Sequence, residues 1–259
     1  MQLQTSTALI TGGASGLGEA TARLFISQGA KAVILDLNET AGRALESEFP
    51  GQIKFLKTDV ASETEVQNAL DIALQTFGNI QIVVNCAGIA PARKIVGKAD
   101  GIYGPHSLEL FEKTIRINLL GTFNVMRLAA FAMEQNEPNA EGERGVIINT
   151  ASVAAYDGQM GQVAYAASKG GIVSMTLPVA RDLAKSGIRV MAIAPGLFET
   201  PLLMGLPEEA RISLGQQIPF PSRLGKPSEY ALLAKSIVEN PMLNGEVIRL
   251  DGAIRMAPR

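Results

Sequence analysis

A tyrosine and a lysine stand four residues apart in the sequence YAASK, as Tyr165 and Lys169. On a helix, side chains at this spacing project from one face, so the phenol and the ammonium would lie together. A neighbouring ammonium favours the phenolate, which predicts a tyrosine pKa lowered from about 10 toward the range of a general acid or base. Ser152 supplies a hydroxyl upstream. The pattern predicts a proton-transferring tyrosine, and an exposed helical pair is the alternative.

A glycine-rich turn, TGGASGLG, spans residues 11–18 and leads into a helix-compatible stretch over residues 19–28. Glycines between a strand and a helix let the backbone approach a pyrophosphate, and the helix N-terminus offers free N–H groups to the anion. A turn that only packs the helix onto the strand is the alternative. The residues that we expect to bind a dinucleotide here are Gly12, Ser15, Gly16, Leu17 and Gly18.

Asp36 ends the next apolar run, roughly 20 residues after the glycine turn, where dinucleotide-binding folds carry an acid. Its carboxylate is predicted to hydrogen-bond the adenosine ribose hydroxyls. A carboxylate repels a 2′-phosphate, and neither residues 13–15 nor Leu37 supply a basic group to receive one. NAD(H) is therefore favoured over NADP(H). A solvated aspartate at a strand end is the alternative.

Two further strand ends carry candidate cofactor contacts. Asp59 and Val60 follow the third apolar run, and Cys86 and Gly88 lie after the fourth, in the sequence NCAG. Each has an ordinary alternative, because a strand-terminal Asp often caps the next helix and a lone Cys often acts as a small hydrophobe. Their order within one series of alternating strands and helices supports a cofactor role.

Seven short apolar runs, separated by longer helical patterns, must position these residues. The runs span residues 8–11, 32–36, 53–58, 80–85, 146–150, 189–194 and 247–250. Near-continuous apolar runs are typical of parallel strands that helices cover on both faces. Their alternation with helices predicts right-handed crossovers and an α/β fold. We expect one doubly wound Rossmann domain over residues 1–259, with a seven-stranded, mostly parallel sheet.

Two segments depart from this alternation. Residues 89–107 carry three basic residues, and residues 197–220 carry an apolar stretch, LLMGL. Both follow predicted strands at their carboxyl ends, where open α/β sheets bind ligands. A third, polar stretch over residues 134–144 is expected to be a surface loop.

Composition narrows the classes of partner. Of the 259 residues, 23 are Lys or Arg and 25 are Asp or Glu, so the charge footprint of a nucleic-acid or anionic-membrane binder is missing. Cys86 is the single cysteine and His106 the single histidine, which excludes an intrachain disulfide and leaves no zinc ligand set. With no room for a signal peptide and no run long enough to span a membrane, we expect a cytoplasmic protein without a metal site.

Taken in order, the motifs resemble the short-chain dehydrogenase/reductase family over the whole chain. They are TGGASGLG, Asp36, Asp59, NCAG, Asn118, Ser152, YAASK and Pro195-Gly196. The resemblance implies that Tyr165 is the general base and that Ser152 holds the substrate oxygen. It implies that Lys169 is the partner of the phenol and a ligand of the nicotinamide ribose, that Asn118 positions a water relay, and that Pro195 lies at the cofactor.

Longer stretches resemble the type-2 short-chain 3-hydroxyacyl-CoA dehydrogenases, also called 17β-hydroxysteroid dehydrogenases type 10. They are NCAGIA, NLLGTFNVMRL, QNEP, RGVIINTASVAA, ASKGGIV, TLPVARDLA, APGLF, PFPSRLG and NGEVIRLDGAIRM, with departures mainly in residues 89–107 and 207–217. Cys86 stands where most of the wider family has Asn. The chain resembles that group closely enough to imply a set of cofactor and substrate contacts.

By this resemblance, Phe198 and Thr200 would close over the nicotinamide and Gln159 would face the acyl pocket. Residues 202–206 would form a mobile lid, with Leu202 and Leu203 at the substrate. Ordinary packing is the alternative for the lid. The basic residues of the 89–107 segment are either solvated loop charges or clamps for CoA phosphates, and they are Arg93, Lys94 and Lys98.

The resemblance implies a homotetrameric enzyme of fatty acid metabolism. Its reaction would be the reversible NAD-dependent oxidation of an (S)-3-hydroxyacyl-CoA, including short or 2-methyl-branched chains, with hydroxysteroids as possible side substrates. One alternative is a 3-oxoacyl-[acyl carrier protein] reductase, which often uses NADPH and which Asp36 therefore disfavours. Another is a catalytically idle dinucleotide-binding module, which the intact set of Asn118, Ser152, Tyr165 and Lys169 disfavours.

Overall fold

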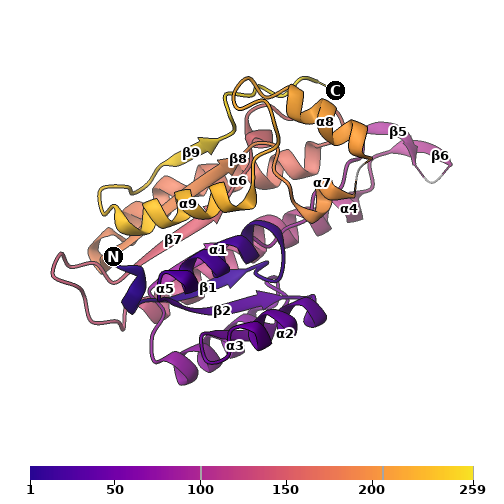
Figure 1. The fold of residues 1–259 in the computed structure, drawn as a ribbon. Helices are drawn as coiled ribbons and strands as arrows, with labels where there is room; N and C mark the ends of the chain where they lie inside the picture. The colour runs from indigo at the N-terminus through magenta and orange to yellow at the C-terminus, as the bar shows by residue number, and fades with distance from the viewer. Residues whose placement is uncertain (100, 206, 259) are drawn as a thin grey trace.

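A seven-stranded parallel sheet lies at the centre of the molecule, in the order β3-β2-β1-β4-β7-β8-β9 (Figure 1). The strands are β1 (Thr7–Thr11), β2 (Lys31–Asp36), β3 (Ile53–Lys57), β4 (Ile82–Asn85), β7 (Gly145–Thr150), β8 (Ile188–Pro195) and β9 (Val247–Leu250). The computed structural model describes residues 1–99, 101–205 and 207–258. Every predicted apolar run is one of these strands, and all six neighbouring pairs are parallel. The predicted doubly wound Rossmann sheet is confirmed.

Helices cover both faces of this sheet. The α-helices in the described part of the chain are α1 (Gly16–Ser27), α2 (Glu39–Glu48), α3 (Glu63–Phe77), α4 (Leu108–Ile115), α5 (Gly121–Met133), α6 (Val163–Asp182), α7 (Pro201–Met204), α8 (Glu208–Gln216) and α9 (Pro227–Glu239). Helices α1 and α9 pack side by side on one face (Figure 1). Helices α3, α5 and α6 bury their apolar side chains in the cluster on the other face. None of the helices in the described part of the chain is both long and apolar enough to cross a membrane.

The strands are apolar on both sides because each face of the sheet has its own core. In β1, Ile10 belongs to the cluster that contains Phe25 of α1, whereas Leu9 belongs to the cluster that contains Val125 of α5. Successive strand residues point to opposite faces of the sheet, so the residues on both faces of the strand must be apolar. This is the physical reason why the strands appear in the sequence as continuous apolar runs.

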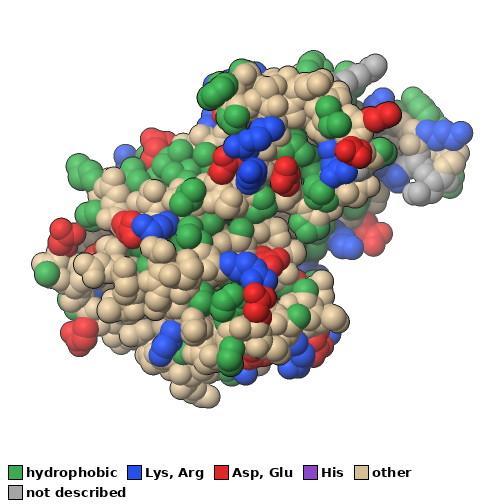
Figure 2. Space-filling view, in the orientation of Figure 1, with side chains coloured by type: hydrophobic (Ala, Val, Ile, Leu, Met, Phe, Trp, Pro, Cys, Tyr) green, Lys and Arg blue, Asp and Glu red, His purple; other side chains and the backbone are tan. Residues whose placement is uncertain are grey.

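The segment after β4 contains a hairpin that the sequence patterns did not predict. It consists of β5 (Val96–Ala99) and β6 (Ile102–Pro105), which pair antiparallel and form a separate two-stranded sheet. The hairpin projects from the rest of the molecule (Figure 1), and hydrophobic and basic side chains gather on it (Figure 2). Ile102 and Tyr103 are exposed. Because its strands have no buried face, they lack the apolar runs that identify the central strands.

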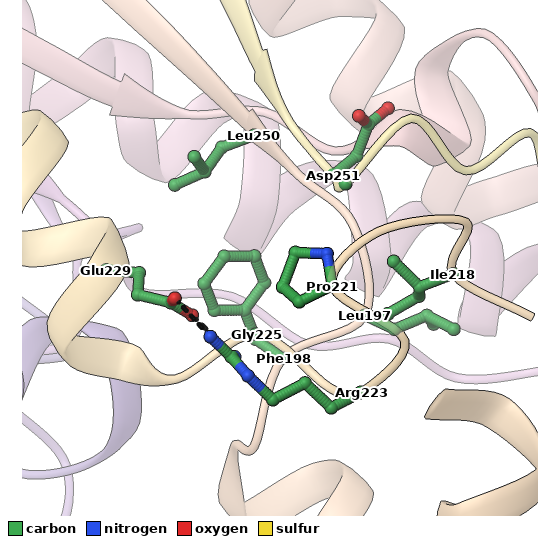
Figure 3. Close-up of a pocket in the computed structure, with 10 residues that line it drawn as sticks. Leu197, Phe198, Ile218, Pro221, Arg223, Gly225, Glu229, Leu250 and Asp251 are labelled. Atoms are coloured by element: carbon green, nitrogen blue, oxygen red, sulfur yellow. Dashed lines mark hydrogen bonds and ion pairs between the residues drawn. The ribbon is translucent and has the colours of Figure 1, made fainter. Parts of the chain in front are cut away.

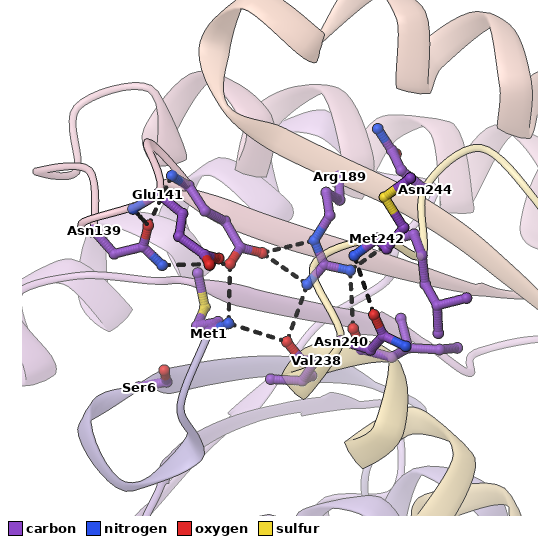
Figure 4. A network of polar contacts seen from close by, with 12 residues as sticks. Met1, Ser6, Asn139, Glu141, Arg189, Val238, Asn240, Met242 and Asn244 are labelled. Atoms are coloured by element: carbon purple, nitrogen blue, oxygen red, sulfur yellow. Dashed lines mark hydrogen bonds and ion pairs between the residues drawn. The ribbon is translucent and has the colours of Figure 1, made fainter.

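A buried ion pair lies at the amino-terminal edge of the sheet (Figure 4). Arg189 at the start of β8 approaches Glu143, just before β7, to 2.7 Å, and both side chains are almost fully buried. The guanidinium also donates to the carbonyl oxygens of Ile237, Val238 and Leu243 at the end of α9 and beyond it. We call Arg189, Glu143 and these three carbonyl groups the amino-edge cluster. All five guanidinium N–H groups therefore have acceptors.

Candidate active site

The carboxyl ends of β1, β4, β7 and β8 meet at one edge of the sheet, and the predicted site residues follow them. The glycine turn follows β1, the NCAG sequence starts at the end of β4, and Ser152 lies two residues after β7. Pro195 is the last residue of β8. The strand order reverses between β1 and β4, and open α/β sheets bind ligands at such a switch point.

The glycine turn packs too tightly for side chains at three of its positions, Gly12, Gly13 and Gly18. Gly12 has a φ of +63°, and a Cβ atom there would lie 2.8 Å from the backbone nitrogen of Ala87. A Cβ at Gly18 would lie 2.3 Å from the carbonyl oxygen of Gly12. Helix α1 begins at Gly16, with Ser15 as the preceding N-cap residue. The first N–H groups of α1 therefore have no acceptor within the helix and are free for an anion.

Asp36, the last residue of β2, lies directly against this turn. One carboxylate oxygen accepts a hydrogen bond from the backbone N–H of Ala14 at 3.1 Å, and the other accepts from Asn38 at 2.9 Å. The next side chain, Leu37, is 61% exposed. The structure thus places the carboxylate beside the glycine turn, where a ribose-binding acid belongs.

Asp59 and Val60 lie in the turn between β3 and α3. The Asp59 carboxylate accepts a hydrogen bond from the backbone N–H of Ala61 at 2.9 Å, which stabilises this turn. Val60 is buried, and its carbonyl oxygen accepts from the side-chain amide of Asn124 at 2.9 Å. Both residues have clear local roles here, and their contact with a cofactor stays a prediction.

Residues 86–88 connect the glycine turn to the catalytic candidates. Ala87 lies against Gly12, and a Cβ atom at Gly88 would lie 3.1 Å from Oδ1 of Asn118 and 3.8 Å from Nζ of Lys169. The absence of a side chain at Gly88 therefore keeps the space beside Lys169 open. The turn, this segment and Lys169 form one continuous wall of the site.

Asn118 lies in a π-helical turn, Arg116–Leu120, between α4 and α5. Its buried side-chain amide accepts from the N–H of Ile89 and donates to the carbonyl oxygen of the same residue, both at 2.8 Å. It also donates to Oγ of Ser168 at 3.0 Å. Asn118 thereby ties the segment after β4 to α6. π-Helical turns are frequent at functional sites, and the predicted water relay stays a prediction.

Tyr165 and Lys169 lie on one face of α6, as their spacing predicted. Nζ of Lys169 is 5.8 Å from the centroid of the Tyr165 ring. The same ammonium donates to the backbone carbonyl oxygen of Thr150 at 2.6 Å, and the lysine is almost fully buried. Ser152 is also buried, and its Oγ accepts from the backbone N–H of Ala154 at 3.1 Å. Helix α6 and the end of β7 therefore bring a phenol, an ammonium and a hydroxyl together.

The expected lowering of the Tyr165 pKa is wrong for this structure. Burial raises the pKa of the phenol, and a hydrogen bond with Ser152 opposes this with a smaller effect. Burial also lowers the pKa of Lys169 from 10.5 to about 8, with Cys86 opposing it. Desolvation disfavours the charged form of both groups, so it acts against the phenolate and against the ammonium. Local helix spacing could not show this, because burial depends on the tertiary structure.

The family resemblance implied that Phe198 closes over the nicotinamide. In the structure its side chain is buried against Gly225. A Cβ atom at Gly225 would lie 2.8 Å from its ring. The ring lines a small cavity of about 120 Å³. Figure 3 shows it near the ion pair between Arg223 and Glu229. The cavity is lined by residues of the 197–198, 218–229 and 250–252 segments. The contact of Phe198 with a nicotinamide stays a prediction.

The start of α7 lies against the glycine turn. A Cβ atom at Gly16 would lie 3.2 Å from Cδ of Pro201 and 3.7 Å from Cγ2 of Thr200. Thr200 thus lies beside the proposed pyrophosphate site. Helix α7 includes Leu202 and the partly buried Leu203, whereas Leu206 of the expected lid lies outside the described residues. The lid stays a prediction.

Gln159 contacts the C-terminal segment. Its Nε2 donates to the carbonyl oxygen of Ala257 at 2.9 Å, and the backbone N–H of Met160 donates to that of Pro258 at 3.0 Å. The C-terminal segment therefore lies beside residues 159–160. A position for Gln159 at the acyl pocket stays a prediction.

Two residues at this edge were missed by the motifs. Thr150 supplies the carbonyl oxygen that holds Lys169, and its Oγ1 lies 2.7 Å from the hydroxyl of Tyr230 in α9. A tyrosine within the apolar run of a helix weakly indicates a buried polar contact, because a buried phenol needs a hydrogen-bond partner. The sequence could not identify that partner, which lies 80 residues away.

Comparisons with known proteins agree with these motifs. A family profile described as short chain dehydrogenase matches residues 6–211. The 3-hydroxyacyl-CoA dehydrogenase type-2 of Homo sapiens is 60% identical over 251 residues, which cover 97% of this chain and 95% of that protein. The solved structure of 3-hydroxyacyl-CoA dehydrogenase type-2 from Mycobacterium avium is 43% identical, with a TM-score of 0.91 over 98% of this chain and 97% of that one.

A third relative is more distant. The 3-ketoacyl-(acyl-carrier-protein) reductase from Brucella melitensis, solved in complex with NADH, is 30% identical. It has a TM-score of 0.85 over 98% of this chain and 100% of its own. Fold, motifs and relatives agree over nearly the whole length, so this chain belongs to the short-chain dehydrogenase family of oxidoreductases.

Proposed function

We propose that this enzyme catalyses the reversible NAD-dependent oxidation of (S)-3-hydroxyacyl-CoA to 3-oxoacyl-CoA, with short and 2-methyl-branched chains among its substrates. One observation carries the chemistry. Residues 86–88 pack against the glycine turn at Gly12, and a Cβ atom at Gly88 would lie 3.8 Å from the Lys169 ammonium. The dinucleotide-binding turn and the proton-transferring residues thus share one wall.

The residues present fit a nicotinamide dinucleotide. Side chains at Gly12 and Gly18 would collide with backbone, so the turn is built without them, and the first N–H groups of α1 are free for the pyrophosphate. The Asp36 carboxylate beside the turn suits a ribose with two free hydroxyls. Family membership and the NADH-bound Brucella structure support a nicotinamide cofactor, and Asp36 supports NAD(H) specifically. The bound cofactor would accept the hydride from the substrate carbinol or return it to the ketone.

The chain itself supplies the proton transfer. Tyr165 would take the hydroxyl proton on its phenolic oxygen, and Ser152 would hold the substrate oxygen by a hydrogen bond. Because burial raises the pKa of Tyr165, the proton must be drawn away by positive charge and hydrogen bonds. Lys169, held 5.8 Å from the ring centroid, supplies the charge, and Ser152 supplies a hydrogen bond. Asn118 would position the water that exchanges this proton.

The relatives support the choice of substrate. Two proteins named 3-hydroxyacyl-CoA dehydrogenase type-2 are 60% and 43% identical to this chain. Contacts with the CoA portion would supply binding energy that positions the carbinol, so a truncated substrate should lose turnover as well as affinity. Gln159, Leu202 and Leu203 are the proposed substrate contacts. Fatty acid metabolism is the corresponding physiological role.

The rival enzyme activity has weaker support. A 3-oxoacyl-[acyl carrier protein] reductase activity has the Brucella relative in its favour, at 30% identity. The position of the Asp36 carboxylate argues against the NADPH that such reductases often use. A catalytically idle module is disfavoured because Ser152, Tyr165 and Lys169 converge at the site.

Three properties complete the proposal. Residues 1–259 would act as one NAD-binding domain, four copies would associate, and the enzyme would work in the cytoplasm. The family resemblance supports the tetramer, and the single cysteine supports a reducing compartment. Light scattering should give a mass near four times the 27.4 kDa of one chain.

The test is a panel of initial rates under one set of conditions. It compares 3-hydroxybutyryl-CoA, its 2-methyl homologue, free 3-hydroxybutyrate, the acyl carrier protein thioester and a 17β-hydroxysteroid, each with NAD⁺ and NADP⁺. The CoA thioesters with NAD⁺ should have the highest kcat/KM. If the free acid, the carrier-protein thioester or the steroid exceeds them, the acyl-CoA assignment is wrong although the dehydrogenase chemistry stands.

A further inference from the structure

Cys86, Thr150 and Tyr230 form a closed hydrogen-bonded ring next to Lys169. The Thr150 hydroxyl donates to Sγ of Cys86 at 3.5 Å, and the thiol donates to the Tyr230 hydroxyl at 3.7 Å. The hydroxyls of Tyr230 and Thr150 lie 2.7 Å apart. If Tyr230 donates to Thr150, each group donates once and accepts once, and every proton in the ring is used. We call these three residues the hydroxyl–thiol ring.

The ring joins three elements in a buried place. Cys86 follows β4, Thr150 ends β7, and Tyr230 lies near the start of α9. Tyr230 is completely buried, and burial raises the pKa of its phenol well above the ordinary value, so it stays protonated. Buried hydroxyl groups are costly when they lack partners, and groups in a cyclic network strengthen one another. Removing the phenolic hydroxyl alone would leave both Thr150 and Cys86 short of a partner.

Thr150 connects the ring to the catalytic groups. Its side chain contacts Tyr230, whereas its backbone carbonyl oxygen accepts the ammonium of Lys169 at 2.6 Å. It is the last residue of β7, and Ser152 follows after one residue. The contact with Tyr230 anchors the side chain at the point where the chain leaves the sheet, beside the backbone hydrogen bond from Ala151 to Ile193 of β8. The orientation of the carbonyl group that holds Lys169 therefore depends on that contact.

We propose that Tyr230 is a positioning residue for Lys169 and acts on it through Thr150. This inference rests on the proposed function, in which Lys169 is a catalytic residue. The titratable groups that face Lys169 are the Tyr165 phenol on its own helix and the Cys86 thiol beyond β4, with the Tyr230 phenol of α9 next to Cys86. Without the Tyr230 hydroxyl, the Thr150 carbonyl group that accepts from the Lys169 ammonium is held less firmly. The charged form of Lys169 is then less stable.

The test compares four variants with matched chemistry. Tyr230→Phe removes the phenolic hydroxyl and keeps the ring volume, and Thr150→Val removes the other hydroxyl while the carbonyl stays. Thr150→Ser keeps a hydroxyl at the same place and should rescue the effect. Thr114→Val is the control, because it removes a buried hydroxyl that bonds only within α4, to the carbonyl oxygen of Leu110 at 2.8 Å.

The first readout needs no activity. The carbon resonances of labelled lysine are followed against pH, with the Lys169 signal assigned by its loss in Lys169→Arg. Tyr230→Phe and Thr150→Val should lower the pKa of Lys169 by at least about 0.4 unit, the size expected for one lost hydrogen bond. Thr150→Ser and Thr114→Val should stay within about 0.2 unit of the wild type, below one such bond. Unchanged Lys169 titration in both Tyr230→Phe and Thr150→Val would overturn the inference.

The second readout is the pH profile of kcat for alcohol oxidation. A weaker ammonium stabilises the Tyr165 phenolate less, so the acidic limb should move to higher pH in Tyr230→Phe and Thr150→Val, with kcat at neutral pH lowered about threefold to tenfold. If Tyr230→Phe loses stability to the same extent as Thr114→Val but keeps the wild-type pH profile of kcat, Tyr230 has a packing role only. If Tyr230→Phe does not fold, the contrast between Thr150→Val and Thr150→Ser decides alone. An inactive wild type refutes the proposed function, whereas the lysine titration still tests the positioning.

Discussion

The amino-edge cluster and the groups around Lys169 lie at opposite edges of one sheet, and α9 contributes to both. At the amino edge, Arg189 faces the carboxylate of Glu143 and three carbonyl groups, so its charge and all its donors are compensated. At the carboxyl edge, the Lys169 ammonium donates to the neutral carbonyl group of Thr150, and burial lowers its pKa to about 8. Removing one partner of a buried ion pair is strongly destabilising, whereas a buried charge held by neutral groups is costly from the start and its pKa responds to its surroundings.

The two ends of α9 explain part of this difference. Arg189 bonds the last carbonyl groups of the helix, where a positive charge is favoured by the helix dipole. Tyr230, in the first turns of the same helix, contributes a neutral hydroxyl toward Thr150. Substitutions at the two edges should therefore separate stability from catalysis.

The largest effect is expected at the carboxyl edge. Tyr165→Phe removes only the hydroxyl that we propose transfers the proton, so kcat should fall by about 10² to 10⁴, while NADH binding stays nearly intact. Lys169→Ala should damage both. Single-turnover rates and fluorescence titration with NADH measure the two quantities. Near-normal kcat across pH in Tyr165→Phe would remove Tyr165 as the general base.

Breaking the amino-edge pair should give the opposite result. Glu143→Ala leaves Arg189 buried without its carboxylate, which should lower the free energy of unfolding by about 3 to 5 kcal/mol. The kcat of the folded fraction should not change. Urea unfolding measures the loss, with Glu39→Ala as the control, because its ion pair with Arg43 is exposed to solvent and contributes little to stability. Equal losses in both variants would show that burial does not distinguish the two pairs.

The pH dependence of stability should identify Lys169. Because burial lowers its pKa from 10.5 to about 8, the unfolded chain binds more protons than the folded one between these values. Stability contributed by this group therefore rises with pH across that window and does not change below about pH 8. Relative to Lys169→Met, the wild type should gain on the order of 3 kcal/mol from pH 8 to 10.5. Urea unfolding at several pH values tests this, and a pH-independent difference would contradict it.

The smallest effect concerns the cofactor side of the carboxyl edge. The wild type should prefer NAD(H) over NADP(H) by at least about tenfold in kcat/KM, or roughly 1.4 kcal/mol. Asp36→Ala should narrow this preference and weaken NAD(H) binding, because the carboxylate also accepts from Ala14 of the glycine turn. Glu39→Ala, three residues farther along, serves as the matched loss of a carboxylate. Equal use of both cofactors by the wild type would refute the role of Asp36.

The fold was predictable where local patterns carry it. All seven central strands coincide with apolar runs, because strands buried on both faces must be apolar throughout. The hairpin of β5 and β6 was not predicted, because it packs neither face into the core. Along α6, the four-residue spacing alone placed Tyr165 and Lys169 on one face, because the geometry of a helix is local.

The motifs could indicate candidate residues for the site, but not the contacts that those residues make. The motifs predicted Asn118 and Ser152 as site residues; the structure places Asn118 against Ser168 of α6 and Ser152 two residues after β7, and their catalytic roles stay predictions. The surroundings of Phe198 and Gln159 did not follow from motifs, since they depend on Gly225 and on the C-terminal segment. The same holds for the pKa of Tyr165, whose direction the spacing predicted wrongly.

By itself, the sequence determined the order of strands and helices, the glycine turn, and the pairing of Tyr165 with Lys169, because each depends on residues close together in the chain. Only the tertiary structure decided which groups are buried and what holds them. The contact between Thr150 and Tyr230 joins residues 80 apart, and that between Arg189 and Glu143 joins residues 46 apart. Desolvation depends on the whole packed surroundings of a group, so the same ammonium that helix geometry places beside Tyr165 acquires its lowered pKa from the fold.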